Sequence, residues 1–136
     1  MIQRRVPLPR RSARKGKRTS KRRKSRMALR RECDKRFAQA VKDRDGWACR
    51  ACGSPFRVQC AHVVSRRYHA TRWSMANAVT LCARDHMRFT CDPLAWDAWI
   101  EERFGEAVYS ELKRLARQGV THIDYEAVLA SLPKGE

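Results

Sequence analysis

The chain has 136 residues, enough for one folded domain with a modest core but too few for two domains of ordinary size. It carries 31 lysines and arginines against 14 acidic residues, a formal net charge of +17, and so basic a composition favours a polyanionic partner. No apolar run is long enough to cross a bilayer, and the basic start lacks the apolar segment of a signal peptide. We therefore expect an intracellular protein without a membrane partner.

The excess positive charge is concentrated near the N-terminus. Fifteen basic residues and no acidic residue precede Glu32, whereas the rest of the chain carries 16 basic and 14 acidic residues. Residues 1–26 have few large apolar side chains, and their like charges repel, so they cannot offset the entropy cost of ordering. We expect them to form a disordered basic arm that contacts nucleic-acid phosphates; a solubility tail is the plain alternative. The arm includes a dense run of Lys21, Arg22, Arg23 and Lys24.

Apolar residues recur every four positions from Leu29 to Val41, which predicts one face of a leading helix over residues 27–43. The face consists of Leu29, Cys33, Phe37 and Val41. Because Cys33 lies on this face, we predict a core position for it rather than a ligand role.

Three other cysteines have the spacing of a metal site. Cys49 and Cys52 stand in "CRACG", and a Cys-x-x-Cys turn closed by glycine directs two thiolates at one tetrahedral ion. Cys82 is the expected third ligand. Clustered cysteines with histidines nearby in an intracellular protein indicate a metal more often than disulfides.

The segment between these cysteines predicts strands and then a helix. "FRVQCAHVV" alternates from Phe56 on, which predicts a half-buried strand that ends at His62, with Phe56 and His62 on its buried face. After the arginine-rich "SRRYHATRWSMAN", the apolar run "AVTLC" predicts a second strand and "ARDHMRFTC" a helix.

The C-terminal third predicts further helices. Pro93 stops or restarts the preceding helix, and a stripe of aromatic residues and Ile100 predicts a helix that ends near Gly105. Another helix is expected over about residues 106–118, and a last one with Thr121 as its cap. Such stripes are more typical of core packing than of base-stacking platforms.

With His62 ending a strand, Asn77 in the returning loop and His86 opening a helix, residues 44–99 resemble the HNH (His-Asn-His) endonucleases. The motifs, in order, are "RDGWACRACG", "CAHVVSRRY", "TRW", "N" and "LCARDH". The resemblance implies an α+β fold: a small ββα-metal finger with a zinc knuckle, over residues 44–92. The leading helix and C-terminal helices over residues 93–136 would flank it, so that residues 27–136 form one nuclease domain. It also implies a phage or bacterial protein, acting in the cytoplasm of a bacterium or a phage-infected cell.

The resemblance assigns a role to each signature residue of a metal-dependent DNA endonuclease. Hydrolysis of a phosphodiester needs a base to activate water and a cation to stabilise the developing charge. His62 matches the general base, His86 the ligand of a catalytic Mg²⁺ or Mn²⁺, and Asn77 the residue that orients the base and braces the loop. Many relatives have a ligating residue just before the base, whereas this chain has Ala61, so we expect weak metal binding without DNA.

The fourth ligand of the structural zinc is less obvious. In zinc-containing relatives a second Cys-x-x-Cys pair precedes the final histidine, and here Asp85 stands at the fourth position, where a carboxylate is an accepted but less common ligand. Asp85 would also suit the first turn of a helix capped near Cys82, with or without a metal. Cys60 is the main rival ligand. Cys91 is a weaker one, because nine residues of helix would set it ~13 Å from Cys82.

The loop between base and asparagine contains the expected phosphate contacts, Arg66, Arg67 and Arg72, although a solvated loop is the alternative. The expected partner is double-stranded DNA. Two other functions fit the same residues. One is a junction-resolving recombination nuclease, which would cut branched DNA as a homodimer; the other is a catalytically silent zinc module that only binds DNA or RNA.

Overall fold

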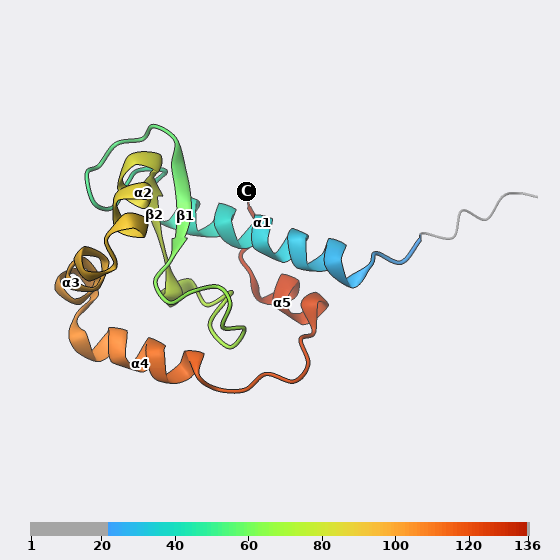
Figure 1. Cartoon of the computed structure of the whole chain (residues 1–136). Helices are drawn as coiled ribbons and strands as arrows, with labels where there is room; N and C mark the ends of the chain where they lie inside the picture. The colour runs from blue at the N-terminus through green and yellow to red at the C-terminus, as the bar shows by residue number, and fades with distance from the viewer. Residues whose placement is uncertain (1–21, 136) are drawn as a thin grey trace, which may run out of the picture.

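A computed structural model describes residues 22–135 of the chain. Within this part, five α-helices surround one two-stranded antiparallel sheet, a mixed α/β arrangement (Figure 1). The elements in chain order are α1 (Arg26–Arg44), β1 (Val58–His62), the short 3-10 turn η1 (Met75–Asn77), β2 (Ala78–Cys82), α2 (Ala83–Cys91), α3 (Pro93–Phe104), α4 (Glu106–Ala116) and α5 (Tyr125–Ser131). Lys21 and the residues before it lie outside the described part, whereas Arg22, Arg23 and Lys24 are described and exposed.

The sheet lies between two helices. β1 and β2 pair over five residues, with Val58 opposite Cys82 at one end and His62 opposite Ala78 at the other. Phe37 of α1 packs with Ala78 on one face of the sheet, and Phe89 of α2 packs on the other (Figure 1). Every residue of β2 is buried because both faces are covered.

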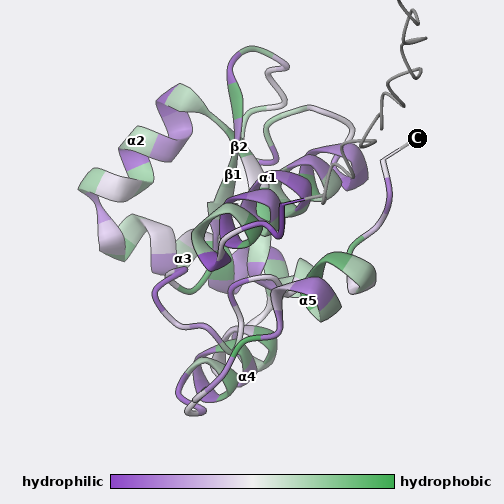
Figure 2. Cartoon of the chain, turned by 90° about the vertical axis from the view of Figure 1, so that its right-hand side faces the viewer, coloured by the Kyte–Doolittle hydropathy of each residue, from purple (hydrophilic) through white to green (hydrophobic). Residues whose placement is uncertain are grey.

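The leading helix forms as predicted and extends one residue further at each end. Ser25 caps α1 by accepting a hydrogen bond from the backbone N–H of Ala28. Polar residues dominate its ribbon in Figure 2, because only one narrow face meets the core. Cys33 is fully buried and its thiol donates to the Tyr125 carbonyl at 3.4 Å, which confirms its predicted core position.

The first strand differs from the prediction in length and in burial. It begins at Val58 rather than at Phe56 and ends at His62 as predicted, and Phe56, expected on the buried face, is 71% exposed. The extended chain begins only after Arg57, which adopts a positive φ of 49°. Ala61, on the face expected to meet solvent, is only 3% exposed, because α2 covers that side.

The second strand, the helix after it and the aromatic stripe agree with the predictions. α2 spans residues 83–91, and Pro93 occupies the first turn of α3 behind an Asp92 cap. Trp96 and Trp99 lie 5.1 and 5.3 Å from the Phe89 ring, so this stripe is core. The aromatic cluster attaches α3 to the helix that follows the sheet.

The last two helices are shorter than expected. α4 ends at Ala116 rather than near Gln118. α5 is capped by Asp124, whose carboxylate accepts from the backbone N–H of Ala127, and not by Thr121. Three residues separate the two candidates, and only Asp124 directly precedes the helical turn, the position a cap requires.

Among residues 22–135, each helix is too short or too polar to cross a lipid bilayer.

Two phenylalanines provide a matched test of this packing. Phe37 is 1% exposed beneath the sheet, and Phe56 is 71% exposed beside it. We expect Phe37→Ala to lower the free energy of unfolding by about 3–5 kcal/mol and Phe56→Ala to change it by no more than about 0.5 kcal/mol. Urea unfolding followed by circular dichroism measures both, and equal losses would contradict the observed packing.

Candidate functional site

The residues predicted to bind a structural metal come together at one end of the sheet. The ligand atoms of Cys49, Cys52, Cys82 and Asp85 all lie within 4.8 Å of one another. The Cys52 and Cys82 sulfurs are 3.7 Å apart, and Asp85 Oδ2 lies 3.3 Å from the Cys49 sulfur. Around a tetrahedral zinc with bonds of about 2.3 Å to sulfur and 2.0 Å to oxygen, two sulfurs lie about 3.8 Å apart, and a sulfur and an oxygen about 3.5 Å apart. The group could therefore hold one ion of the size of zinc.

Two local structures bring these four side chains together. Cys49 and Cys52 stand in a tight turn closed by a 2.7 Å hydrogen bond from Gly53 N–H to the Cys49 carbonyl, and Gly53 has a positive φ of 78° that suits glycine. Cys82 ends β2 and caps α2, its sulfur accepting from the Asp85 N–H at 3.4 Å. The start of the helix therefore places Asp85 beside Cys82.

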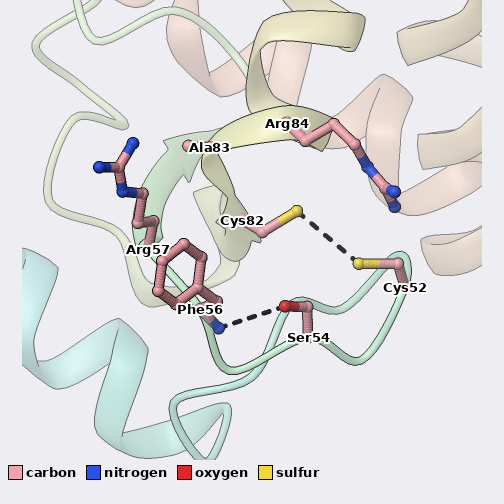
Figure 3. A pocket seen from close by; sticks show the side chains of 7 residues that line it. All are labelled: Cys52, Ser54, Phe56, Arg57, Cys82, Ala83 and Arg84. Carbon is pink, nitrogen blue, oxygen red and sulfur yellow. Dashed lines mark hydrogen bonds between the residues drawn. The ribbon is translucent and has the colours of Figure 1, made fainter.

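Figure 3 shows the exposed side of this cluster, where the sulfurs of Cys52 and Cys82 point toward each other. Phe56 and Arg57 lie beside them, with the Arg57 guanidinium 5.6 Å from the centre of the Phe56 ring. Cys49, Cys82 and Asp85 are buried, whereas Cys52 is exposed, so a metal would reach this site from the Cys52 side.

The charge of Asp85 is divided between the cluster and the surface. Its Oδ2 faces the sulfurs, while its Oδ1 lies 3.4 Å from Arg88 and 3.7 Å from Arg84. Burial raises the pKa of this carboxyl, but hydrogen bonds from the three thiols and the charge of Arg84 lower it below its usual value. The carboxylate is therefore ionised, as a metal ligand must be, and the two arginines offset the negative charge of the group.

The rival fourth ligands do not join the group. Cys60 lies on the β1 face toward α1, where burial raises the pKa of its thiol to about 11. Cys91 is exposed at the end of α2. Asp85 is instead the fourth member, and the cap at this helix comes from the Cys82 sulfur rather than from the Asp85 side chain.

His62 is held at the end of β1 with one ring nitrogen occupied. Its Nε2 lies 2.9 Å from the Arg72 carbonyl, and its ring stacks on Phe37 at 5.4 Å. Because a carbonyl only accepts, Nε2 carries the proton and Nδ1 of the neutral ring keeps a lone pair. Burial lowers the pKa of His62, and the charges of Arg72 and Arg66 act in the same direction. The ring is therefore neutral at neutral pH.

His86 is fixed by a residue that the sequence reasoning missed. Its Nδ1 lies 2.6 Å from Oε1 of Gln59 on β1. Since the amide oxygen accepts, Nδ1 carries the proton and Nε2 keeps the lone pair that a metal would need. The alternation of the strand could have revealed this contact. Gln59 and His62 point to opposite faces of β1, and α2, which carries His86, lies over the face of Gln59.

The two histidines line the same two cavities. One, of about 440 Å³, also has Asp34, Ser65 and Arg66 in its walls. The other, of about 240 Å³, is walled by α2 and α3 and lies against Phe89 and Trp96. The structure therefore brings His62 and His86 together between two open cavities, one lined by charged residues and the other by aromatic residues.

Asn77 does not reach this place but supports the loop beside it. It is fully buried, and its Oδ1 accepts from the Val64 N–H at 2.8 Å. Its Nδ2 donates to the carbonyls of Val64 and Thr71. The side-chain amide of Asn77 therefore connects Val64, before the arginine-rich loop, to Thr71 within it.

Arg72 corrects the prediction of three phosphate contacts in this loop. It is 3% exposed, and its guanidinium bonds Asp34 of α1 at 2.7 and 3.0 Å and the Arg66 carbonyl at 3.0 Å. Burial raises the pKa of Asp34, but the bonds and charge of Arg72 and the Trp73 N–H lower it below its usual value, so the carboxylate stays ionised. Arg72 thus connects the loop to α1 inside the protein, whereas Arg66 and Arg67 are exposed.

Comparison of the chain with protein-family models, with curated proteins and with solved structures gives no match in any of the three. The resemblance to HNH endonucleases therefore depends on the sequence motifs.

The fourth ligand can be tested by substitution and metal analysis. If Asp85 holds zinc, Asp85→Ala should release the ion and destabilise the fold, because metal-binding free energy at such a site is also folding free energy. Asp85→Cys should keep the ion, since a thiolate can occupy the same corner. Elemental analysis after mild chelation measures the retained zinc.

Cys60→Ala is the matched control, and it should keep the metal of the wild type. If Asp85 acted only at the helix start, Asp85→Ala would cost ~1 kcal/mol and leave the zinc content unchanged. Zinc loss in Cys60→Ala together with full retention in Asp85→Ala would refute Asp85 as the fourth ligand.

Proposed function

We propose that this protein is a metal-dependent DNA endonuclease of the HNH type, with a ββα-metal finger formed by β1, β2 and α2 and a structural zinc at the Cys49–Asp85 cluster. The proposal rests on one observation above all. His62 and His86 line one cavity, and each has one ring nitrogen bonded to an accepting oxygen, which leaves the other nitrogen with a lone pair. A base and a metal ligand need that state.

In the proposed reaction His62 acts as the general base and His86 as the ligand of the catalytic cation. Nδ1 of His62 takes a proton from the attacking water as its oxygen bonds to phosphorus, and the bond to the leaving oxygen breaks. The resulting imidazolium is stabilised by its Nε2–H bond to the Arg72 carbonyl and later returns its proton to solvent, while the leaving oxygen takes a proton from water. Phe37, stacked on the ring, keeps Nδ1 in a constant direction.

His86 would hold the catalytic cation, Mg²⁺ or Mn²⁺, through Nε2. Such a cation, when bound, neutralises negative charge that develops on the phosphate and the leaving oxygen. Ala61 stands beside His62 and is buried against Phe89, so it adds no ligand. The remaining ligands would be water and phosphate oxygens, which suits a hard cation that binds together with the substrate.

Two further features support a nucleic-acid substrate. Arg66 is exposed on the rim of the histidine cavity, where it could contact a phosphate next to the scissile one. The excess positive charge of the chain is also concentrated before Glu32, ahead of most of α1.

A second candidate function is a zinc module that binds nucleic acid without cutting it. The observation that favours it is Ala61, a buried apolar residue where a metal ligand would strengthen the cation site. The two functions differ in one readout. Incubation with supercoiled, linear and four-way-junction DNA, with Mg²⁺, Mn²⁺ or no added divalent cation, shows nicked or cut products only for the endonuclease.

Replacement of the base provides the decisive variant. We expect His62→Ala to lower the cleavage rate by at least about a hundredfold, because general-base catalysis typically contributes that much. DNA affinity should stay near that of the wild type, since the ring is half-buried and the surface charge is unchanged. Single-turnover cleavage and equilibrium binding measure the two effects. Cleavage at the wild-type rate would show that His62 is not the base.

The pH dependence of cleavage follows from the pKa of His62, which burial lowers below the ordinary histidine value of 6.5. The ring must be neutral to act as a base, and a lowered pKa keeps it neutral to a lower pH. We therefore expect kcat/KM to rise with pH through a midpoint below 6.5 and then to level off. A midpoint clearly above that value would contradict a buried, neutral base.

A further inference from the structure

One side of α1 carries unpaired positive charge that leads to the histidine cavity. At 3.6 residues per turn, Arg31, Lys35 and Ala38 lie in one stripe along the helix, and Ala38 lines the cavity. Arg31 and Lys35 are exposed. With a rise of 1.5 Å per residue, Lys35 stands about 4.5 Å and Arg31 about 10 Å along the axis from Ala38. The stripe therefore reaches the cavity wall from the N-terminal side.

The acidic residues of α1 do not cancel this stripe. Glu32 stands three residues before Lys35 and its pKa is lowered mainly by Lys24 and more weakly by Lys35, but its carboxylate pairs with Lys24. Asp43 accepts from the Trp47 indole. Asp34 is close to the stripe, but its charge is bound to Arg72. The cavity side of α1 is thus positive along its exposed length.

Three arginines of the later helices lie close to carboxylates, whereas Arg31 and Lys35 form no ion pair within residues 22–135. Arg84 and Arg88 both lie near Asp85, and Arg114 pairs with Glu111. Like charges four residues apart destabilise a helix by about 0.2–0.5 kcal/mol, so this arrangement has a cost in the free chain that a polyanion would remove.

The geometry points to a DNA-backbone track along α1, in which Arg31 and Lys35 bind phosphates of the strand whose scissile phosphate enters the histidine cavity. Arg66 stands on the cavity rim formed by the opposite loop, so the strand would lie between two basic walls. Ala38, at the junction, has no long side chain to obstruct the backbone. Successive phosphates of one strand advance by about 3.4 Å along the duplex axis, so the two cations would reach phosphates within about three nucleotides of the cut. The position of the cut relative to this track rests on the proposed function, whereas the test below measures DNA binding and does not require cutting.

The test is equilibrium binding of the full chain to a labelled DNA duplex, without added magnesium, over a series of salt concentrations. Loss of two phosphate contacts should lower the slope of log affinity against log salt by about two in Arg31→Gln/Lys35→Gln. At low salt the affinity should fall on the order of tenfold. The matched control is Arg103→Gln/Arg117→Gln, which removes the same charge from exposed positions in α3 and after α4. Its slope should stay close to that of the wild type.

An unchanged slope in Arg31→Gln/Lys35→Gln, or an equal fall in the control, would overturn the track. So would a loss of binding to phosphatidylserine vesicles without a loss of DNA binding, since that would assign the stripe to a lipid surface. Thermal unfolding of both double variants should match the wild type, because neither change touches the core. A chain that binds DNA through this stripe but never cuts it contradicts the endonuclease alone. Cutting with an unchanged slope contradicts the track alone.

Discussion

The pairing between β1 and β2 determines where the functional side chains stand. Two short strands have little stability in water by themselves, and this pair is held by helices on both faces and by the cysteine cluster at one end. Cys82 lies at that end, opposite Val58, and His62 lies at the other, opposite Ala78. A slip of one residue would turn His62 toward α2 and Gln59 toward α1, which would separate both histidines from their partners. Metal binding at the cluster would therefore also stabilise the register on which the histidine cavity depends.

The histidine cavity is not a property of the β1–β2–α2 segment alone. α1 contributes Phe37, which stacks on His62, and Asp34, which holds Arg72. The carbonyl of Arg72 in turn bonds His62. Two contacts from one helix, made by residues 25 and 28 positions before the histidine in the chain, thus fix the direction and tautomer of its ring. Arg72 is buried in this ion pair whereas the Asp34 side chain is 32% exposed, and desolvation of the guanidinium offsets part of the attraction, so we assign the pair to specifying one loop conformation rather than to adding stability.

The charges of the protein fall into two groups with different partners. At the cluster, Arg84 and Arg88 face Asp85, so positive charge there balances the acidic ligand. Around the histidine cavity, Arg66 is exposed, and Arg31 and Lys35 of the α1 stripe form no ion pair among the described residues. The proposed anionic substrate would therefore be attracted to the cavity more than to the cluster.

The sequence by itself determined the features that depend on neighbours along the chain. The Cys-x-x-Cys turn, the placement of Cys82 and Asp85 at the start of a helix, and the buried face of α1 all follow from short-range spacing, because turn closure and helical periodicity act over a few residues. The tertiary structure decided the rest. Arg72 connects its loop to α1 because Asp34, 38 residues away, packs against that loop, and Gln59 became the partner of His86 across 27 residues. Phe56 was left exposed by a backbone turn at Arg57 that alternation alone does not reveal. Arg72 and His86 have partners that are distant in the chain, and the exposure of Phe56 depends on the backbone conformation of one residue. Neither kind of feature changes the periodicity of apolar residues from which elements are predicted.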